Sequence, residues 1–107
     1  MFTQESAIKY ALKYIAAAKK LDIKIERAIL FGSYSTGLQQ EQSDIDLAIV
    51  SKDFTDNPLD NWKRIGPATI KFNLIEPHLF TWKDYKRKNS FIHEEIIKNG
   101  IEIPLHD

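Results

Sequence analysis

The most informative stretch of this sequence is FGSYSTGLQQEQSDIDLAIV, residues 31–50. It contains the pair Gly32 and Ser33, ten further residues, and then Asp44 and Asp46 at the start of an otherwise apolar run. Because successive side chains of a β-strand point to opposite faces, a strand over this run places both aspartates on the same side. Neighbouring carboxylates repel each other, and a divalent cation that prefers oxygen ligands relieves that repulsion. The aspartate pair therefore predicts a magnesium site.

The Gly–Ser pair follows a second apolar run, residues 28–31. We expect this run to be a buried strand, so that Gly32 and Ser33 lie in the turn that leaves it. A glycine lets backbone amides approach an anion closely, and a serine hydroxyl adds a donor to a phosphate. A phosphate-binding turn that faces a metal site is typical of proteins that act on nucleoside triphosphates.

With these motifs the chain resembles the nucleotidyltransferase superfamily that includes DNA polymerase beta, and within it the minimal nucleotidyltransferases of bacteria and archaea. The shared pattern is Gly32-Ser33-x10-Asp44-x-Asp46 with apolar strands on both sides. A lone Gly–Ser or a lone D-x-D is unspecific, since either can be a helix cap or a loop, whereas their joint occurrence at this spacing is specific. The resemblance is strong over residues 28–50.

The family pattern also requires a third acid on a later strand, near the aspartate pair, and the resemblance is weak in that region, residues 69–80. Alternating apolar and polar residues predict a strand over residues 69–76, which contains no aspartate and ends at Glu76. The resemblance therefore implies that Glu76 completes the site for two magnesium ions and takes the proton of the attacking hydroxyl. An ordinary glutamate at a strand end is the alternative. His78, expected in the following loop, is either a donor to the substrate or a structural or solvated histidine.

The reaction that the resemblance implies is transfer of AMP from ATP to a hydroxyl, with release of pyrophosphate. Gly32 and Ser33 would hold the outer phosphates, and Asp44 and Asp46 would hold the magnesium ions. Minimal nucleotidyltransferases are typically encoded beside a small helical protein of the HEPN class, the two acting as antitoxin and toxin. The resemblance thus implies a partner protein of this class as the acceptor.

Two other functions remain open from the sequence. A missing or displaced third acid would leave a catalytically weak nucleotide-binding module that neutralises its partner by contact alone. The resemblance also allows an antibiotic-modifying nucleotidyltransferase, but 107 residues leave no room for a second domain that encloses a small substrate.

Composition sets further bounds on function. We expect one domain, residues 1–107. The 15 basic and 15 acidic residues cancel, which disfavours direct binding of nucleic acid through a broad positive surface. The chain has no cysteine, which excludes disulfides and thiolate metal sites. Short apolar runs and the lack of a signal-peptide pattern lead us to expect a cytoplasmic protein without a membrane span.

Apolar periodicity and capping residues predict the remaining elements. The expected helices are residues 4–21 capped by Thr3, a short turn from Thr36, residues 58–65 before the stop signal Gly66-Pro67, one from Trp82 capped by Thr81, and one from Ser90 to Asn99. The expected strands are residues 26–31, 45–50, 69–76 and an edge strand near 101–104. Leu59 and Trp62 are expected to cover the core, with a binding patch or a flap over the site as alternatives. The predicted class is a small α+β (α/β-like) domain with a mixed sheet flanked by helices, in agreement with the nucleotidyltransferase fold that the resemblance implies.

Overall fold

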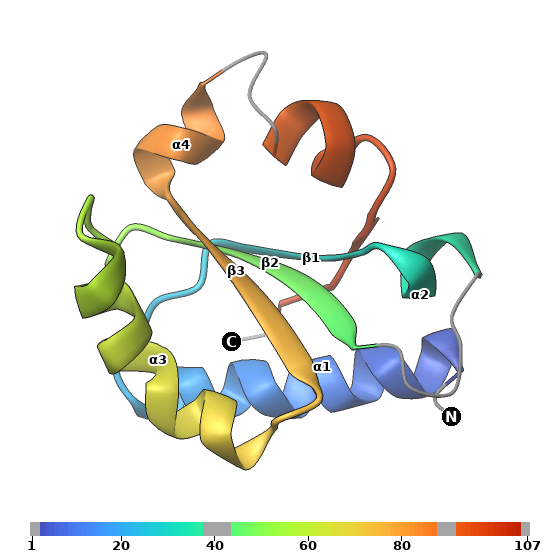
Figure 1. Cartoon of the computed structure of the whole chain (residues 1–107), viewed down its shortest axis with the longest axis horizontal. Coiled ribbons are helices and arrows are strands. Elements are labelled where there is room, and N and C mark those ends of the chain that lie inside the picture. The colour runs from blue at the N-terminus through green and yellow to red at the C-terminus, as the bar shows by residue number, and fades with distance from the viewer. Residues whose placement is uncertain (1–2, 38–43, 88–91, 106–107) are drawn as a thin grey trace.

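The computed structural model describes residues 3–37, 44–87 and 92–105, which form a four-stranded sheet with helices on both faces (Figure 1). The helices are α1 (Gln4–Lys20), α2 (Ser33–Thr36), α3 (Pro58–Lys71), α4 (Trp82–Lys86) and the π-helix η1 (Ile92–Ile97). The strands are β1 (Arg27–Phe31), β2 (Ile45–Ser51), β3 (Ile75–Thr81) and β4 (Ile101–Glu102). In the part of the chain that the structure describes, no helix is both long enough and apolar enough to cross a membrane.

The sheet has the strand order β3-β2-β1-β4. β2 pairs with β3 in parallel, while β1 is antiparallel to both β2 and β4, so the prediction of a mixed sheet is confirmed. The parallel register sets Asp46 of β2 beside Glu76 of β3. β4 lies at the edge of the sheet, as its proline-terminated sequence predicts.

Two apolar clusters cover the two faces of the central strands. Below the sheet in Figure 1, α1 and α3 pack against it through the larger cluster, which includes Tyr14, Leu30 and Leu47. On the opposite face, α4 and η1 pack around Ile29 and Val50. Because both faces of β1 and β2 are covered, their near-continuous apolar sequences are explained.

The sequence prediction for the third helix and third strand is wrong. Gly66 and Pro67 do not end the helix, because α3 continues through both of them. Ile65 and Ala68, on either side of the pair, are buried in the larger cluster. This packing outweighs the cost of about 3 kcal/mol for a proline in a helix interior. Residues 69–76 are therefore mostly helix and turn, and β3 begins only at the end of that range.

Two shorter helices also differ from the prediction. The turn expected to begin near Thr36 begins at Ser33 and ends at Thr36. The expected cap Ser90 lies outside the described residues, and the helix that follows is of the π type and ends at Ile97, before Asn99. Both segments are short, and sequence patterns specify the bounds of such elements poorly.

The capping of α4 is confirmed, whereas the burial of the start of α3 is not. The Thr81 hydroxyl accepts the backbone N–H of Asp84, as a helix cap does. Leu59 and Trp62, expected to cover the core, are 61% and 43% exposed, so that prediction is wrong. The first turns of α3 therefore present apolar side chains to solvent.

Candidate active site

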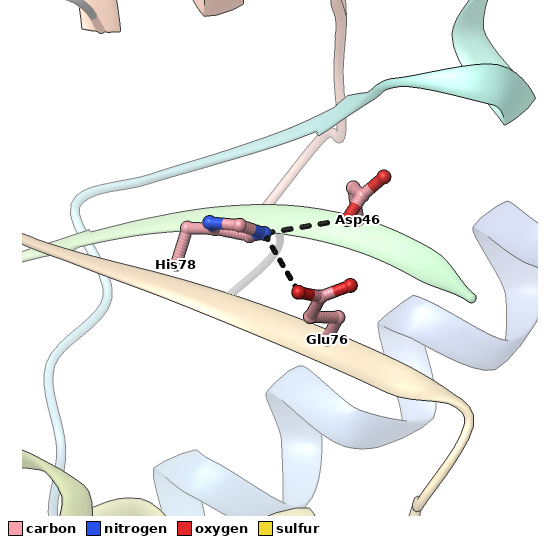
Figure 2. A group of neighbouring side chains, drawn as sticks. All are labelled: Asp46, Glu76 and His78. Atoms are coloured by element: carbon pink, nitrogen blue, oxygen red, sulfur yellow. Dashed lines mark hydrogen bonds and ion pairs between the residues drawn. The ribbon is translucent and has the colours of Figure 1, made fainter.

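Two neighbouring strands bring three polar side chains together. β2 carries Asp46, and β3 carries Glu76 and His78, whose spacing of two residues puts both on one face of the strand. One ligand atom from each of the three residues lies within 4.8 Å of the others (Figure 2). The sheet register thus creates a compact cluster of two carboxylates and one imidazole, called here the β2–β3 cluster.

His78 is oriented toward both carboxylates. Its Nε2 atom lies 3.3 Å from Asp46 Oδ1 and 3.9 Å from Glu76 Oε1 (Figure 2). The ring also makes an edge contact with Phe31 of β1, with 4.8 Å between ring centroids. The expectation that His78 lies in a loop is wrong, because β3 extends past it.

Gly32 links the Gly–Ser motif to the acidic motif in space. It has φ +72° and ψ −148° at the N-terminus of α2, a backbone conformation that favours glycine. A Cβ atom at this position would overlap Asp46 Oδ2 and lie 3.2 Å from Asp46 Cγ. Register explains the contact, since Phe31 pairs with Asp46 and Gly32 follows directly. The close approach of backbone and carboxylate leaves no room for a side chain.

Ser33 begins α2 beside this contact. The Gly32 carbonyl accepts the Ser35 hydroxyl at 2.9 Å, which helps to hold the turn. The Ser33 side chain is partly exposed and lines an open cleft, so its hydroxyl is accessible to a ligand.

Asp44 lies outside the β2–β3 cluster. It is exposed and immediately precedes β2. Its charge still reaches the cluster, because the pKa of Glu76 is raised by partial burial of the carboxyl, next by the charge of Asp46, and also by Asp44, while His78 opposes the shift. The Glu76 side chain as a whole is 55% exposed, so the carboxyl remains accessible to a ligand.

Of the residues singled out in the sequence, the structure brings Gly32, Asp46 and Glu76 into one site, with Asp44 and Ser33 at its margin. Glu76 reaches the site from the start of β3 and not from the end of the strand that was predicted. The sequence did not assign His78 to a cluster. The signal that could have found it is the Glu-x-His spacing, which places two side chains on one face of any strand.

Two open clefts lie near the β2–β3 cluster: one is lined by Gly32, which lies against Asp46, and the other is lined by His78 itself. The first, of about 840 Å³, includes Gly32, Ser33 and Phe31. The second, of about 450 Å³, lies between β3 and the start of α3 and includes His78 and Trp62. Phe31 lines the first cleft and His78 lines the second, and their rings are in contact. The clefts are here called the Ser33 cleft and the Trp62 cleft.

The side chains present fit a divalent cation. Carboxylate oxygens are the protein ligands that Mg²⁺ prefers. The raised pKa of Glu76 reflects, after burial, repulsion between it and Asp46 that His78 offsets only in part and that a cation between them would relieve. Asp46 and Glu76 are therefore suited to hold such an ion, with Asp44 close enough to add charge.

Comparison with known proteins agrees with this geometry. The family model described as "Nucleotidyltransferase domain" matches residues 11–103. Over 82 residues the chain is 34% identical to "Putative protein adenylyltransferase MJ0141" of Methanocaldococcus jannaschii, covering 75% of this chain and 80% of that protein.

Two solved structures share the fold. A crystal structure described as "the toxin-antitoxin with AMP-PNP" has a TM-score of 0.59 and 22% identity, covering 90% of this chain and 74% of that one. The crystal structure of a mutant of the toxin-antitoxin MntA-HpeT has a TM-score of 0.52 and 20% identity, covering 99% of this chain and 76% of that one. In that mutant two aspartates, separated by one residue, are replaced by glutamates. The fold class predicted from the sequence is confirmed.

Proposed function

Because this chain belongs to the nucleotidyltransferase domain family, we propose that it transfers AMP from ATP to a hydroxyl of a partner protein, releasing pyrophosphate. The observation that carries the proposal is the contact of Gly32 with Asp46, beside Glu76, which joins the phosphate-binding motif to the acidic site. The name of the curated relative supports a protein as acceptor, and the two solved relatives support a toxin as partner.

The Ser33 cleft is the proposed ATP site. Backbone amides at the start of α2 and the Ser33 hydroxyl would bind the outer phosphates. Gly32 allows this turn to lie directly against Asp46, so that a phosphate held by the turn also faces the acidic site.

The proposed metal ligands are Asp44, Asp46 and Glu76, with two Mg²⁺ ions. Bound Mg²⁺ would neutralise charge on the α-phosphate and on the leaving pyrophosphate. The close approach of Gly32 restricts the position of the Asp46 carboxylate for this role. Glu76, whose carboxyl remains accessible, would orient the acceptor hydroxyl and take its proton. The oxygen of the acceptor then forms the new bond to the α-phosphorus, and the bond to pyrophosphate breaks.

The Trp62 cleft is the proposed acceptor side. It reaches the β2–β3 cluster at His78, while the Gly–Ser turn lines the other cleft. The exposed Trp62 ring gives this cleft an apolar wall for a protein segment. The proposed partner is a small helical toxin of the HEPN class, and residues 1–107 would act as a single cytoplasmic domain.

One observation favours a second candidate function. Asp44 is exposed and lies outside the β2–β3 cluster. A site with only Asp46 and Glu76 as acids would bind nucleotide weakly and catalyse transfer slowly. In that case the protein would neutralise its partner by contact alone.

Labelling of the partner distinguishes the two functions. The purified protein is incubated with ATP labelled at the α-phosphate, Mg²⁺ and the proposed HEPN-type partner. We expect label on the partner with wild type and with Glu5→Gln, an exposed control acid on α1, and none with Asp46→Asn or Glu76→Gln. Complex formation should persist in all four proteins. Protection of cells by a wild type that never labels the partner would refute AMP transfer and favour neutralisation by contact.

A further inference from the structure

The position of His78 suits a metal ligand better than a hydrogen-bond partner. Its distance of 3.3 Å from Asp46 Oδ1 is longer than the usual range of about 2.7–3.2 Å for an N–H···O bond, and the distance to Glu76 Oε1 is 3.9 Å. Two ligands that each lie about 2.1 Å from one octahedral ion are about 3.0 Å apart when adjacent and about 4.2 Å apart when opposite. Both separations from His78 Nε2 fall within that interval.

The side chain is also held in place for this role. Glu76 and His78 share one face of β3, and the sheet register brings Asp46 to the same point. The edge contact with Phe31 restricts the rotation of the imidazole, so that Nε2 faces the two carboxylates (Figure 2). Three ligands from two adjacent strands therefore converge with little rearrangement.

An imidazole changes the metal preference of a carboxylate site. Mg²⁺ takes oxygen ligands almost exclusively, whereas imidazole nitrogen favours first-row transition metals. We propose that His78 is a direct nitrogen ligand and that the β2–β3 cluster binds a transition-metal dication such as Mn²⁺ more tightly than Mg²⁺, even without nucleotide. This rests on the proposed function only in taking Asp46 and Glu76 as metal ligands.

The test is a titration of the nucleotide-free protein with Mn²⁺, followed by electron paramagnetic resonance. Pulsed measurements detect the nuclear spin of a nitrogen bonded to Mn²⁺. We expect a nitrogen coupling in wild type that changes when all histidines carry ¹⁵N, and displacement of Mn²⁺ only by a large excess of Mg²⁺. His78→Gln should lose the coupling and weaken Mn²⁺ binding at least about tenfold. His93→Gln, which changes a histidine outside the cluster, should keep both.

Three results would overturn the inference: binding of Mn²⁺ without nitrogen coupling, a coupling that survives in His78→Gln, or no binding of Mn²⁺ in the absence of nucleotide. If His78→Gln does not fold, absence of a ¹⁵N-dependent coupling in wild type still refutes the inference, and loss of the coupling in His93→Gln refutes it as well. Failure of the proposed function is a separate outcome, since a protein that binds Mn²⁺ through nitrogen yet labels no partner would refute only AMP transfer.

Discussion

Replacing Gly32 by alanine should weaken both the fold and the acidic site. The backbone at Gly32, with φ +72° and ψ −148°, lies near a region that is almost reserved for glycine, which costs other residues about 1–3 kcal/mol. The new methyl group would also overlap Asp46 Oδ2, so the carboxylate must move by roughly 1 Å to restore ordinary contact. We therefore expect a loss of at least about 1–3 kcal/mol in the free energy of unfolding, together with weaker metal binding.

Two other glycines separate the causes. Gly37 has φ +78° with open space around its Cβ position, so Gly37→Ala should show backbone strain alone, about 1–2 kcal/mol, with metal binding unchanged. Gly66 lies within α3 with open space and no positive φ, so Gly66→Ala should stabilise the protein by about 0.5–1 kcal/mol. Urea unfolding and Mn²⁺ titration of the three variants measure both quantities.

The decisive comparison is between Gly32→Ala and Gly37→Ala. If Gly32→Ala costs no more stability than Gly37→Ala and keeps the wild-type affinity for Mn²⁺, then Gly32 does not hold the Asp46 carboxylate in place. The physical link between the two sequence motifs would then be refuted.

Three other changes probe separate parts of the molecule. Ser33→Ala should weaken ATP binding, measured by calorimetry, by the value of one charge-assisted hydrogen bond, about 1.5–3 kcal/mol. The midpoint of urea unfolding should not change. A lower midpoint with unchanged ATP affinity would show that Ser33 has a structural role. Burial raises the pKa of Tyr14 to about 12, against the lowering effect of its hydrogen bond to Thr69. Unfolded tyrosine ionises near pH 10, so above that pH the native state binds more protons than the unfolded state. The contribution of Tyr14 to the free energy of unfolding should therefore be fully present below about pH 10. It should fall by about 2–3 kcal/mol as the pH rises to about 12. Urea unfolding at about pH 9 and about pH 11 should show about half of this loss, roughly 1.4 kcal/mol, in wild type and a smaller loss in Tyr14→Phe. Equal losses would contradict the assignment. Trp62→Ala should reduce labelling of the partner without changing ATP affinity. Ile70→Ala, which changes an exposed residue on the same helix but outside the cleft, should change neither quantity. Equal labelling by the two variants would refute the Trp62 cleft as the acceptor side.

The elements with local causes could be predicted from the sequence. β1 and β2 are short apolar runs bounded by polar residues, and Thr3 and Thr81 cap helices through contacts three residues away. The end of α3 could not be predicted, because Gly66 and Pro67 are stop signals by local rules and only packing of the neighbouring residues on α1 and the sheet overrides them. Because the predicted helix ends too early, the predicted third strand also begins too early.

The site followed from the sequence only in part, for a related reason. The spacing alone predicts that Asp44 and Asp46 share a side of one strand, but Asp44 immediately precedes β2 and only Asp46 lies in it. The proximity of Asp46 to Glu76 depends on the register of two parallel strands that a helix separates in the sequence. The spacing of residues along the sequence does not determine such a register. His78 joins the cluster because β3 extends past it, whereas the sequence predicts that the strand ends at Glu76.

The edge strand β4 has a consequence for the order in which the protein can fold. β4 pairs with β1, and Glu102 lies opposite Ile29, so one neighbour of β1 is made long after β1 itself. At synthesis rates of about 5–20 residues per second, that edge of β1 stays unpaired on the ribosome for on the order of 4–15 s. An unpaired apolar edge invites pairing with other chains. The nascent chain therefore passes through an interval of aggregation risk that ends when residues 101–102 emerge and pair with β1.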